Sequence, residues 1–251
     1  MRGVLTLLNQ SIWFPDPSEA DEDGLLAFGG DLSVERLLFG YQNSIFPWYN
    51  PTEQILWWTP PERYIMKPDK VHVSHSMKKF MKKHGIHMEI GRDFPGTMHR
   101  CREKREGETW ITDEMEEAYY HLNQAGYATG VEVFFDGMLA GGLYGVIIDK
   151  CFFGESMFTL ISNGSKAALI MLAALLRQKG FYLIDCQFHT DHLESMGGEF
   201  IPREEYLRDL MQYAATLKRV DLNGCYGFDP EHGTVYEIRD RECCGIEKGS
   251  M

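Results

Sequence analysis

The segment from Cys151 to Gln187 constrains the fold of this 251-residue chain more than any other. An apolar run, CFFGESMF, leads into the turn SNGS, and the almost entirely apolar segment Ala167 to Gln178 follows. A helix that is apolar on every side is typical of a protein interior. Gly180, a residue typical of a helix end, precedes a second apolar run, FYLIDCQF. We therefore predict a strand–helix–strand unit, whose two strands are normally parallel with a right-handed crossover.

Three polar side chains interrupt these apolar runs. Glu155 lies in the first run, and Asp185 and Gln187 lie two residues apart in the second, which places them on one face of a strand. A carboxylate in apolar surroundings loses hydration, so it needs a partner or a functional role. We expect the three groups to converge on one cleft near the start of the helix. The alternative is a buried polar network that only fixes the register of the strands.

The residues upstream predict two more strands in the same sheet. The run VEVFF is followed by Asp136-Gly137, a strong signal for a two-residue hairpin, and by MLAGGLYGVII. The glycines of the second run indicate a bulge or a close backbone approach. Asp149-Lys150 then forms the turn into Cys151. The sequence therefore predicts three antiparallel strands, a crossover helix and a parallel strand, an α+β arrangement.

The length allows one or two domains. Residues 1–61, with a helix capped by Ser33 and an aromatic cluster around Trp48, are expected to form a small N-terminal domain. Residues 62–219 hold the predicted sheet. Residues 220–251 are polar, glycine-rich and acidic, and are predicted to be a partly disordered C-terminal tail.

The expected setting is the cytoplasm. No run is long and apolar enough for a bilayer, and the first residues lack the pattern of a signal peptide. The six cysteines form no CxxC pair, which favours reduced thiols over a disulfide framework or a zinc site. His189 and His192 lie three apart without an apparent third ligand, so no metal site is predicted.

Positive charge is concentrated in residues 62–109, although the whole chain carries a net charge of −12. The run SHSMKKFMKKH predicts a helix with its lysines on one face, and HRCREKRE adds a second basic cluster. Such clusters hold a nucleic-acid backbone, while the acidic remainder limits nonspecific binding. The alternative is an ordinary solvated face. The candidate nucleic-acid-binding residues are Lys78, Lys79, Lys82, Lys83, Arg100, Arg102 and Arg105.

The predicted strand order resembles the acyltransferase fold of the GCN5-related N-acetyltransferases. In that fold an activated acyl donor lies between two splayed central strands. Members that use acetyl-CoA carry a (Q/R)xxGx(G/A) loop before the crossover helix. Residues 160–165, LISNGS, lack this motif, so the resemblance does not imply CoA as the donor.

Ten short motifs resemble one family closely, the leucyl/phenylalanyl-tRNA–protein transferases. They occur in family order between about residue 11 and residue 210: GLLAFGGDLS, SIFPWY, ILWWTP, SHSMKKF, ETWIT, GGLYGV, FFGESMF, SNGSKAAL, LIDCQF and IPR. The resemblance implies a small N-terminal α/β domain over a GCN5-related N-acetyltransferase-like C-terminal domain.

The resemblance also implies the reaction. Leucine or phenylalanine, with methionine as a third candidate, would move from its tRNA to the N-terminal Arg or Lys of a protein, which would then be an N-degron substrate. The ester of an aminoacyl-tRNA is already activated, so no ATP, metal or other cofactor is expected. The enzyme has to position an amine against a carbonyl and let the amine lose a proton. We expect a monomer that binds no membrane.

Several positions match functional residues of that family. Asp185 would attract the acceptor amino group and act through Gln187 to orient and deprotonate it, while Glu155 would hold the substrate or order this network. Alternatively, the terminal ribose hydroxyl of the tRNA carries the proton. Trp48 and Trp110 would lie against the terminal adenosine. The amino-acid pocket would be formed by Leu143, Phe152, Leu169 and Leu172.

The chain departs from the family pattern in places. Leu143 and Leu172 stand where Met and Phe are common, which bears on the preference between leucine and phenylalanine. Two other functions are alternatives. A CoA-dependent N-acetyltransferase conflicts with the missing loop motif, and a noncatalytic tRNA-binding module leaves the three polar groups without a role.

Overall fold

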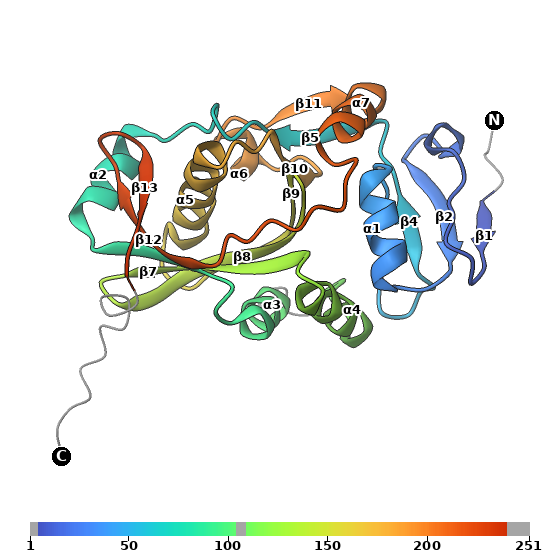
Figure 1. Cartoon of the computed structure of the whole chain (residues 1–251), viewed down its shortest axis with the longest axis horizontal. Coiled ribbons are helices and arrows are strands. Elements are labelled where there is room, and N and C mark those ends of the chain that lie inside the picture. Colours follow the sequence, from blue (N-terminus) through green and yellow to red (C-terminus); the bar gives the residue numbers. More distant parts are fainter. Residues whose placement is uncertain (1–4, 104–108, 240–251) are drawn as a thin grey trace, which may run out of the picture.

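The computed structural model of the chain describes residues 5–103 and 109–239 (Figure 1). It belongs to the mixed α+β class, as predicted. In chain order the elements are β1 (Thr6–Leu8), the short 3-10 helix η1 (Pro17–Glu19), β2 (Leu25–Gly29), α1 (Val34–Gln42), β3 (Phe46–Pro47), β4 (Leu56–Trp58), β5 (Glu62–Met66), α2 (His75–Lys83), β6 (Ile86–Ile90), α3 (Phe94–Glu103), α4 (Asp113–Gln124), β7 (Ala128–Phe135), β8 (Met138–Ile148), β9 (Cys151–Thr159), α5 (Gly164–Gln178), β10 (Leu183–Gln187), α6 (Asp191–Glu194), β11 (Glu199–Pro202), α7 (Arg203–Tyr213), β12 (Gly224–Asp229) and β13 (Thr234–Glu237).

The strands form a small sheet of order β1-β2-β4-β3 and a large sheet of order β11-β5-β10-β9-β8-β7-β6-β12-β13. Figure 1 places the small sheet at one end of the molecule, with α1 between it and the large sheet. Helix α5 packs on one face of the large sheet, and α3 and α4 pack on the other. Among the described residues, no helix combines the length and apolarity that a membrane crossing requires.

The predicted strand–helix–strand unit is confirmed. β7 pairs antiparallel with β8, and β8 pairs antiparallel with β9. Asp136 (φ 51°) and Gly137 (φ 82°) form the predicted two-residue turn between β7 and β8, with the positive φ angles that such turns need. Helix α5 then crosses over, and β10 returns parallel to β9.

The start of α5 lies directly against β8. Asn163 adopts a left-handed conformation (φ 72°) just before the helix. A Cβ on Gly164 would lie only 2.0 Å from the carbonyl oxygen of Ala140, and one on Gly141 would lie 2.7 Å from the carbonyl carbon of Gly164. Only glycine permits such an approach, so the predicted close backbone contact is confirmed. It fixes α5 against a strand that lines the cavity described below.

The prediction of a disordered tail is wrong for the part of it that forms β12 and β13. These strands form a hairpin, and β12 pairs antiparallel with β6 at the edge of the large sheet. Cys225, Tyr226 and Val235 are buried there. The local sequence is polar and glycine-rich, so the decisive interaction is pairing with a strand more than 130 residues away. Residues 240–251 of the predicted tail lie outside the described residues.

The cysteines follow the prediction in part. Cys101, Cys151 and Cys186 are free thiols. Cys225 is disulfide-bonded, so the prediction of a reduced thiol is wrong at that position.

Candidate active site

The central strands β9 and β10 separate where the polar residues lie. Their pairing covers only Leu183 to Asp185, opposite Cys151 to Phe153. The pairing of β9 with β8 skips Glu155, and the pairing of β10 with β5 is interrupted between Asp185 and Gln187, where Gln187 has a φ of 61°. Such bulges redirect side chains and are frequent next to active sites.

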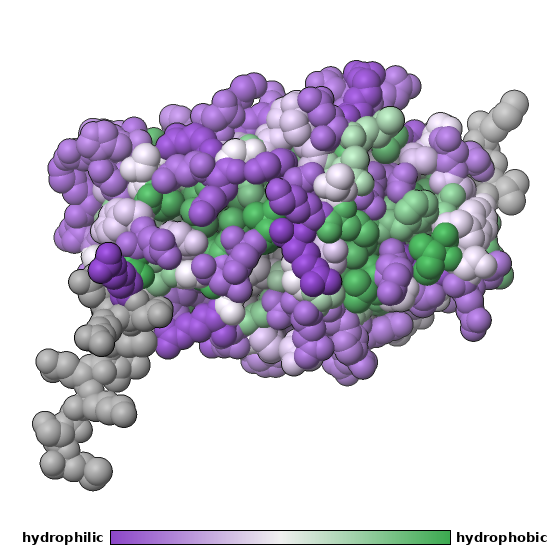
Figure 2. Space-filling view, in the orientation of Figure 1, coloured by the Kyte–Doolittle hydropathy of each residue, from purple (hydrophilic) through white to green (hydrophobic). Residues whose placement is uncertain are grey.

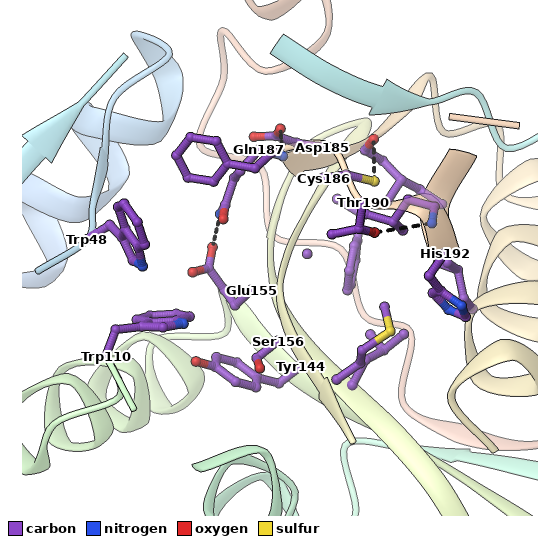
Figure 3. A pocket seen from close by; sticks show the side chains of 18 residues that line it. Trp48, Trp110, Tyr144, Glu155, Ser156, Asp185, Cys186, Gln187, Thr190 and His192 are labelled. Carbon is purple, nitrogen blue, oxygen red and sulfur yellow. Dashed lines mark hydrogen bonds between the residues drawn. The ribbon is translucent and has the colours of Figure 1, made fainter. Parts of the chain in front are cut away.

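A cavity of about 280 Å³ opens at this separation (Figure 3). Its apolar lining comes from β8, β9, β10, α5 and α6: Leu143, Phe152, Met157, Leu169, Ile184 and Leu193. Its polar lining includes Glu155, Ser156, Gln187 and Thr190, and Trp48 and Trp110 lie on the side of the N-terminal sheet. The cavity is therefore apolar on one side and polar with aromatic walls on the other.

Glu155 is the centre of a hydrogen-bond network from four elements. Its Oε1 accepts hydrogen bonds from the Tyr41 hydroxyl (2.7 Å) and from Gln187 Nε2 (3.0 Å). Its Oε2 is hydrogen-bonded to the Tyr119 hydroxyl (3.0 Å), and the two tyrosine hydroxyls also contact each other. Burial raises the pKa of Glu155 to about 7, although the bonds from Tyr41 and Tyr119 oppose this shift.

Asp185 lies behind this network and has no exposed surface. Its two carboxylate oxygens accept hydrogen bonds from Arg63 Nε (2.9 Å) and Nη2 (2.8 Å). Oδ2 also accepts from the Tyr206 hydroxyl (2.8 Å), and Oδ1 accepts from the backbone N–H of Gln187 (2.9 Å). Asp185 therefore holds the bulged backbone that presents Gln187 to the cavity.

Comparison with known proteins decides the family. The family described as leucyl/phenylalanyl-tRNA protein transferase matches residues 65–211, and the N-terminal domain of the same family matches residues 30–61. The chain belongs to this family. A leucyl/phenylalanyl-tRNA–protein transferase of Syntrophus aciditrophicus (strain SB) is 49% identical, covering 89% of this chain and 94% of its own. The transferase of Desulfatibacillum aliphaticivorans is 48% identical, covering 90% of this chain and 97% of its own. The transferase of Pectobacterium carotovorum subsp. carotovorum (strain PC1) is 47% identical, covering 82% of this chain and 89% of its own.

In this member of the transferase family, most of the predicted pocket residues meet in the cavity. Leu143, Phe152 and Leu169 line it. Leu172 is fully buried one helical turn beyond Leu169 on α5 and is not among the lining residues. The sequence does not separate Leu169 from Leu172, because α5 is apolar on nearly every side.

The two predicted tryptophans of this transferase differ in exposure. Trp48, which follows β3, is 41% exposed, whereas Trp110, just before α4, is 8% exposed. The ring of Trp48 lies 5.4 Å from that of Phe188, which also lines the cavity. The polar side of the cavity thus has one buried and one accessible aromatic face.

Sequence reasoning missed the partners of the polar residues. Tyr41, Arg63, Tyr119 and Tyr206 were not predicted for the site. A buried arginine in the run PPERYIM is a signal that points to a carboxylate partner, since charged side chains are seldom buried unpaired. The sequence does not say which carboxylate that is.

The basic residues of this transferase fall into two groups. Lys78, Lys79, Lys82 and Lys83 are exposed on α2, and Lys82 contacts Glu231. Arg100 lies 3.0 Å from Glu132, and Arg102 lies 2.8 Å from Glu116 and also contacts Asp113. Arg105 lies outside the described residues. Figure 2 shows mainly hydrophilic residues over the end of the molecule that carries α2.

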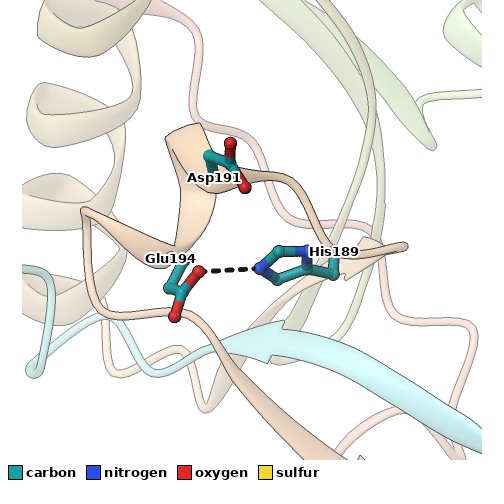
Figure 4. A group of neighbouring side chains, drawn as sticks. All are labelled: His189, Asp191 and Glu194. Carbon is teal, nitrogen blue, oxygen red and sulfur yellow. Dashed lines mark hydrogen bonds and ion pairs between the residues drawn. The ribbon is translucent and has the colours of Figure 1, made fainter.

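A cluster of exposed side chains follows β10 (Figure 4). The ligand atoms of His189, Asp191 and Glu194 lie within 4.8 Å of one another. His189 Nε2 is 3.0 Å from a Glu194 oxygen, so a hydrogen bond accounts for part of this closeness. The structure thus groups His189 with two carboxylates and not with His192, the partner considered from the sequence.

Proposed function

We propose that this chain transfers leucine or phenylalanine from aminoacyl-tRNA to the N-terminal Arg or Lys of acceptor proteins, which marks them for N-degron degradation. The observation that carries the proposal is the divided cavity. Apolar side chains form one side, and the Glu155–Gln187 hydrogen bond with two tryptophans forms the other. An aminoacyl ester has these same two parts, an apolar side chain and a polar reacting centre.

The C-terminal part would have the GCN5-related N-acetyltransferase-like fold. In support, the parallel strands β9 and β10 pair over only three residues and then separate around the cavity. An acyl donor between these strands would lie beside Glu155 and Gln187. The small sheet of the N-terminal domain, residues 1–61, would close the site by supplying Trp48.

The apolar side would bind the side chain of the transferred amino acid. Leu143, Phe152 and Leu169 provide walls without hydrogen-bonding groups. Such walls select by shape, and a methylene group contributes only about 1–3 kcal/mol of discrimination. We expect leucine, phenylalanine and methionine to be accepted to different degrees. Trp48 and Trp110 would bind the terminal adenosine of the tRNA, because aromatic stacking tolerates any base.

Gln187 would orient the acceptor amine. Its N–H donates to Glu155, which leaves its amide oxygen to accept a hydrogen bond from the attacking amine. The amine attacks the ester carbonyl, the new amide forms, and the ribose oxygen leaves with a proton. An α-amino group has an unperturbed pKa of about 7.7–8.0, so a modest shift suffices for its deprotonation. Asp185 would act through the backbone of Gln187, because its carboxylate is fully buried against Arg63.

The acceptor and the tRNA would approach different surfaces. Asp191 and Glu194 are exposed on the segment that supplies Thr190 and His192 to the cavity, and they favour a cationic N-terminal residue. The exposed lysines of α2 would contact the tRNA backbone. We further propose that the protein acts as a cytoplasmic monomer.

The test is transfer of labelled leucine from leucyl-tRNA to a peptide that begins with Arg. An otherwise identical peptide that begins with Ala is the control for acceptor class, and a Gln187→Ala variant is the control for the site. We expect transfer to the Arg peptide alone, without added cofactor, and loss of about 100-fold in the variant from misplacement of the amine. Equal transfer to both peptides, or full activity of Gln187→Ala, would contradict the proposal.

A further inference from the structure

Three oxygen–oxygen contacts connect Tyr41, Tyr119 and Glu155 into a closed ring. The Tyr41 hydroxyl lies 2.7 Å from Glu155 Oε1, the Tyr119 hydroxyl lies 3.0 Å from Glu155 Oε2, and the two hydroxyls contact each other. Each contact at such a distance needs one proton between its oxygens. The two phenols supply two protons for the three contacts of the ring. The Gln187 N–H cannot supply the third, because it donates to Glu155 Oε1 in a separate hydrogen bond.

We propose that Glu155 carries the third proton in the free protein below neutral pH, where it is a neutral carboxylic acid. Tyr41 and Tyr119 then position Glu155, and through it Gln187, by a closed ring of hydrogen bonds. In this ring Tyr119 donates to Tyr41, Tyr41 donates to Oε1, and the protonated Oε2 of Glu155 donates to Tyr119. If Glu155 is ionised, one of the three contacts has no proton and must open.

The second hydrogen bond at Oε1 fits this order. Oε1 accepts from both Tyr41 and Gln187, as the carbonyl oxygen of a neutral acid does, and Oε2 is left for the proton. Both tyrosines are fully buried. Burial, together with nearby Glu155, raises their pKa values well above the usual range, so both phenols keep their protons.

The charged groups around the ring favour the same state. Burial is the main cause of the raised pKa of Glu155, and the negative charge of Asp185 on β10 acts in the same direction. Arg63 on β5 acts in the opposite direction, but its charge is directed at Asp185 through two hydrogen bonds.

The ring joins three parts of the molecule at the cavity. Tyr41 comes from α1 beside the small sheet, Tyr119 from α4, and Glu155 from the bulge of β9. A neutral Glu155 therefore fixes α1 and α4 against the strand that orients Gln187. The importance of Gln187 for transfer rests on the proposed function, but the protonation state of Glu155 does not.

Infrared spectroscopy of the free full-length protein tests the proton directly. Glu132 is also buried with a raised pKa, so its carboxylic-acid band would overlap that of Glu155. The spectra are therefore recorded on the Glu132→Gln variant, which removes the Glu132 band. With ¹³C-labelled glutamate, we expect a carboxylic-acid C=O band at pH 6 that is lost near neutral pH and is absent from Glu132→Gln/Glu155→Gln. Loss of the band near the ordinary glutamate pKa of about 4.3 would overturn the proposal.

The order of the ring has its own test. Tyr41→Phe removes a donor from the carbonyl oxygen, so the same C=O band should shift to higher frequency. An unshifted band would overturn the assignment of Oε1 as the carbonyl oxygen.

Leucine transfer then distinguishes a positioning role from an ionic one. Glu155→Gln keeps an acceptor oxygen for Tyr41 and an N–H for Tyr119, so we expect transfer within about tenfold of the unmodified protein, whereas Glu155→Ala should lose about 100-fold. Equal losses in the two variants would overturn the neutral-acid role. Because the spectra need only the free protein, they decide the protonation state even if no leucine is transferred.

Discussion

Arg63 and Asp185 form an ion pair through two hydrogen bonds, and neither side chain has any exposed surface. The Arg63 guanidinium also lies over the rings of Phe46 (4.5 Å) and Tyr206 (4.9 Å). The planar guanidinium matches both a carboxylate and an aromatic face, which lysine does not. The pair thereby connects β5 to the bulge of β10 and to α7, directly behind Gln187.

Removal of Arg63 should be costly because it leaves Asp185 charged and unpaired. We expect Arg63→Met to lower the free energy of unfolding by about 3–5 kcal/mol, measured by urea denaturation. Adding Asp185→Asn removes the uncompensated charge, so the double variant should be more stable than Arg63→Met. A loss below about 1 kcal/mol in the single variant would mean that the pair contributes little.

Stability should depend on pH through Glu155. Its pKa is about 7 in the folded protein and about 4.3 in an unfolded chain. Between these values only the folded state holds the proton, so rising pH favours unfolding by up to about 1.4 kcal/mol per pH unit. Below about pH 4 and above about pH 7 the contribution no longer changes.

The measurement is the difference in unfolding free energy between the unmodified protein and Glu155→Gln from pH 4 to pH 8. We expect the difference to change across the range in favour of the variant as pH rises. Glu132→Gln is the comparison variant. Burial also raises the pKa of Glu132 to about 7, so its difference in unfolding free energy should change with pH in the same direction, although Glu132 lies away from the cavity. A difference that is constant with pH would contradict a raised pKa at Glu155.

Replacing two leucines of α5 should have different effects, one on the choice of the transferred amino acid and the other on the stability of the fold. Leu169 lines the cavity and Leu172 does not, although both are buried. Leu169→Ala enlarges the pocket, so the ratio of kcat/KM for phenylalanyl-tRNA over leucyl-tRNA should rise by about tenfold. Leu172→Ala should leave this ratio unchanged and destabilise the fold by about 2–5 kcal/mol. An equal change of the ratio in both variants would place Leu172 in the pocket.

The two basic groups should behave differently toward tRNA. Lys78, Lys79 and Lys83 are exposed on α2, so their replacement by Gln should weaken tRNA binding and reduce the slope of log K against log salt by about 2. Arg100→Gln/Arg102→Gln is the matched control, because these arginines are bound to carboxylates. A larger loss of affinity in the arginine variant would reverse this assignment.

The sequence by itself determined the elements whose signals are local. The Asp136-Gly137 turn, the all-apolar helix α5 and the glycines facing its start lie within about 50 residues, and together they predict the strand–helix–strand unit at the centre of the sheet. Leu143, Phe152 and Leu169 lie on those same elements, which is why a local pattern and a family resemblance were enough to place them together.

Only the tertiary structure decided what surrounds the polar residues. Tyr41 is 114 residues from Glu155, and Arg63 is 122 residues from Asp185. A buried carboxylate requires a donor, but any of many tyrosines and arginines satisfies that requirement equally well in the sequence. The same holds for β12, whose place depends on the unpaired edge of β6. Packing chooses among such partners because each pairing must agree with all the others at once.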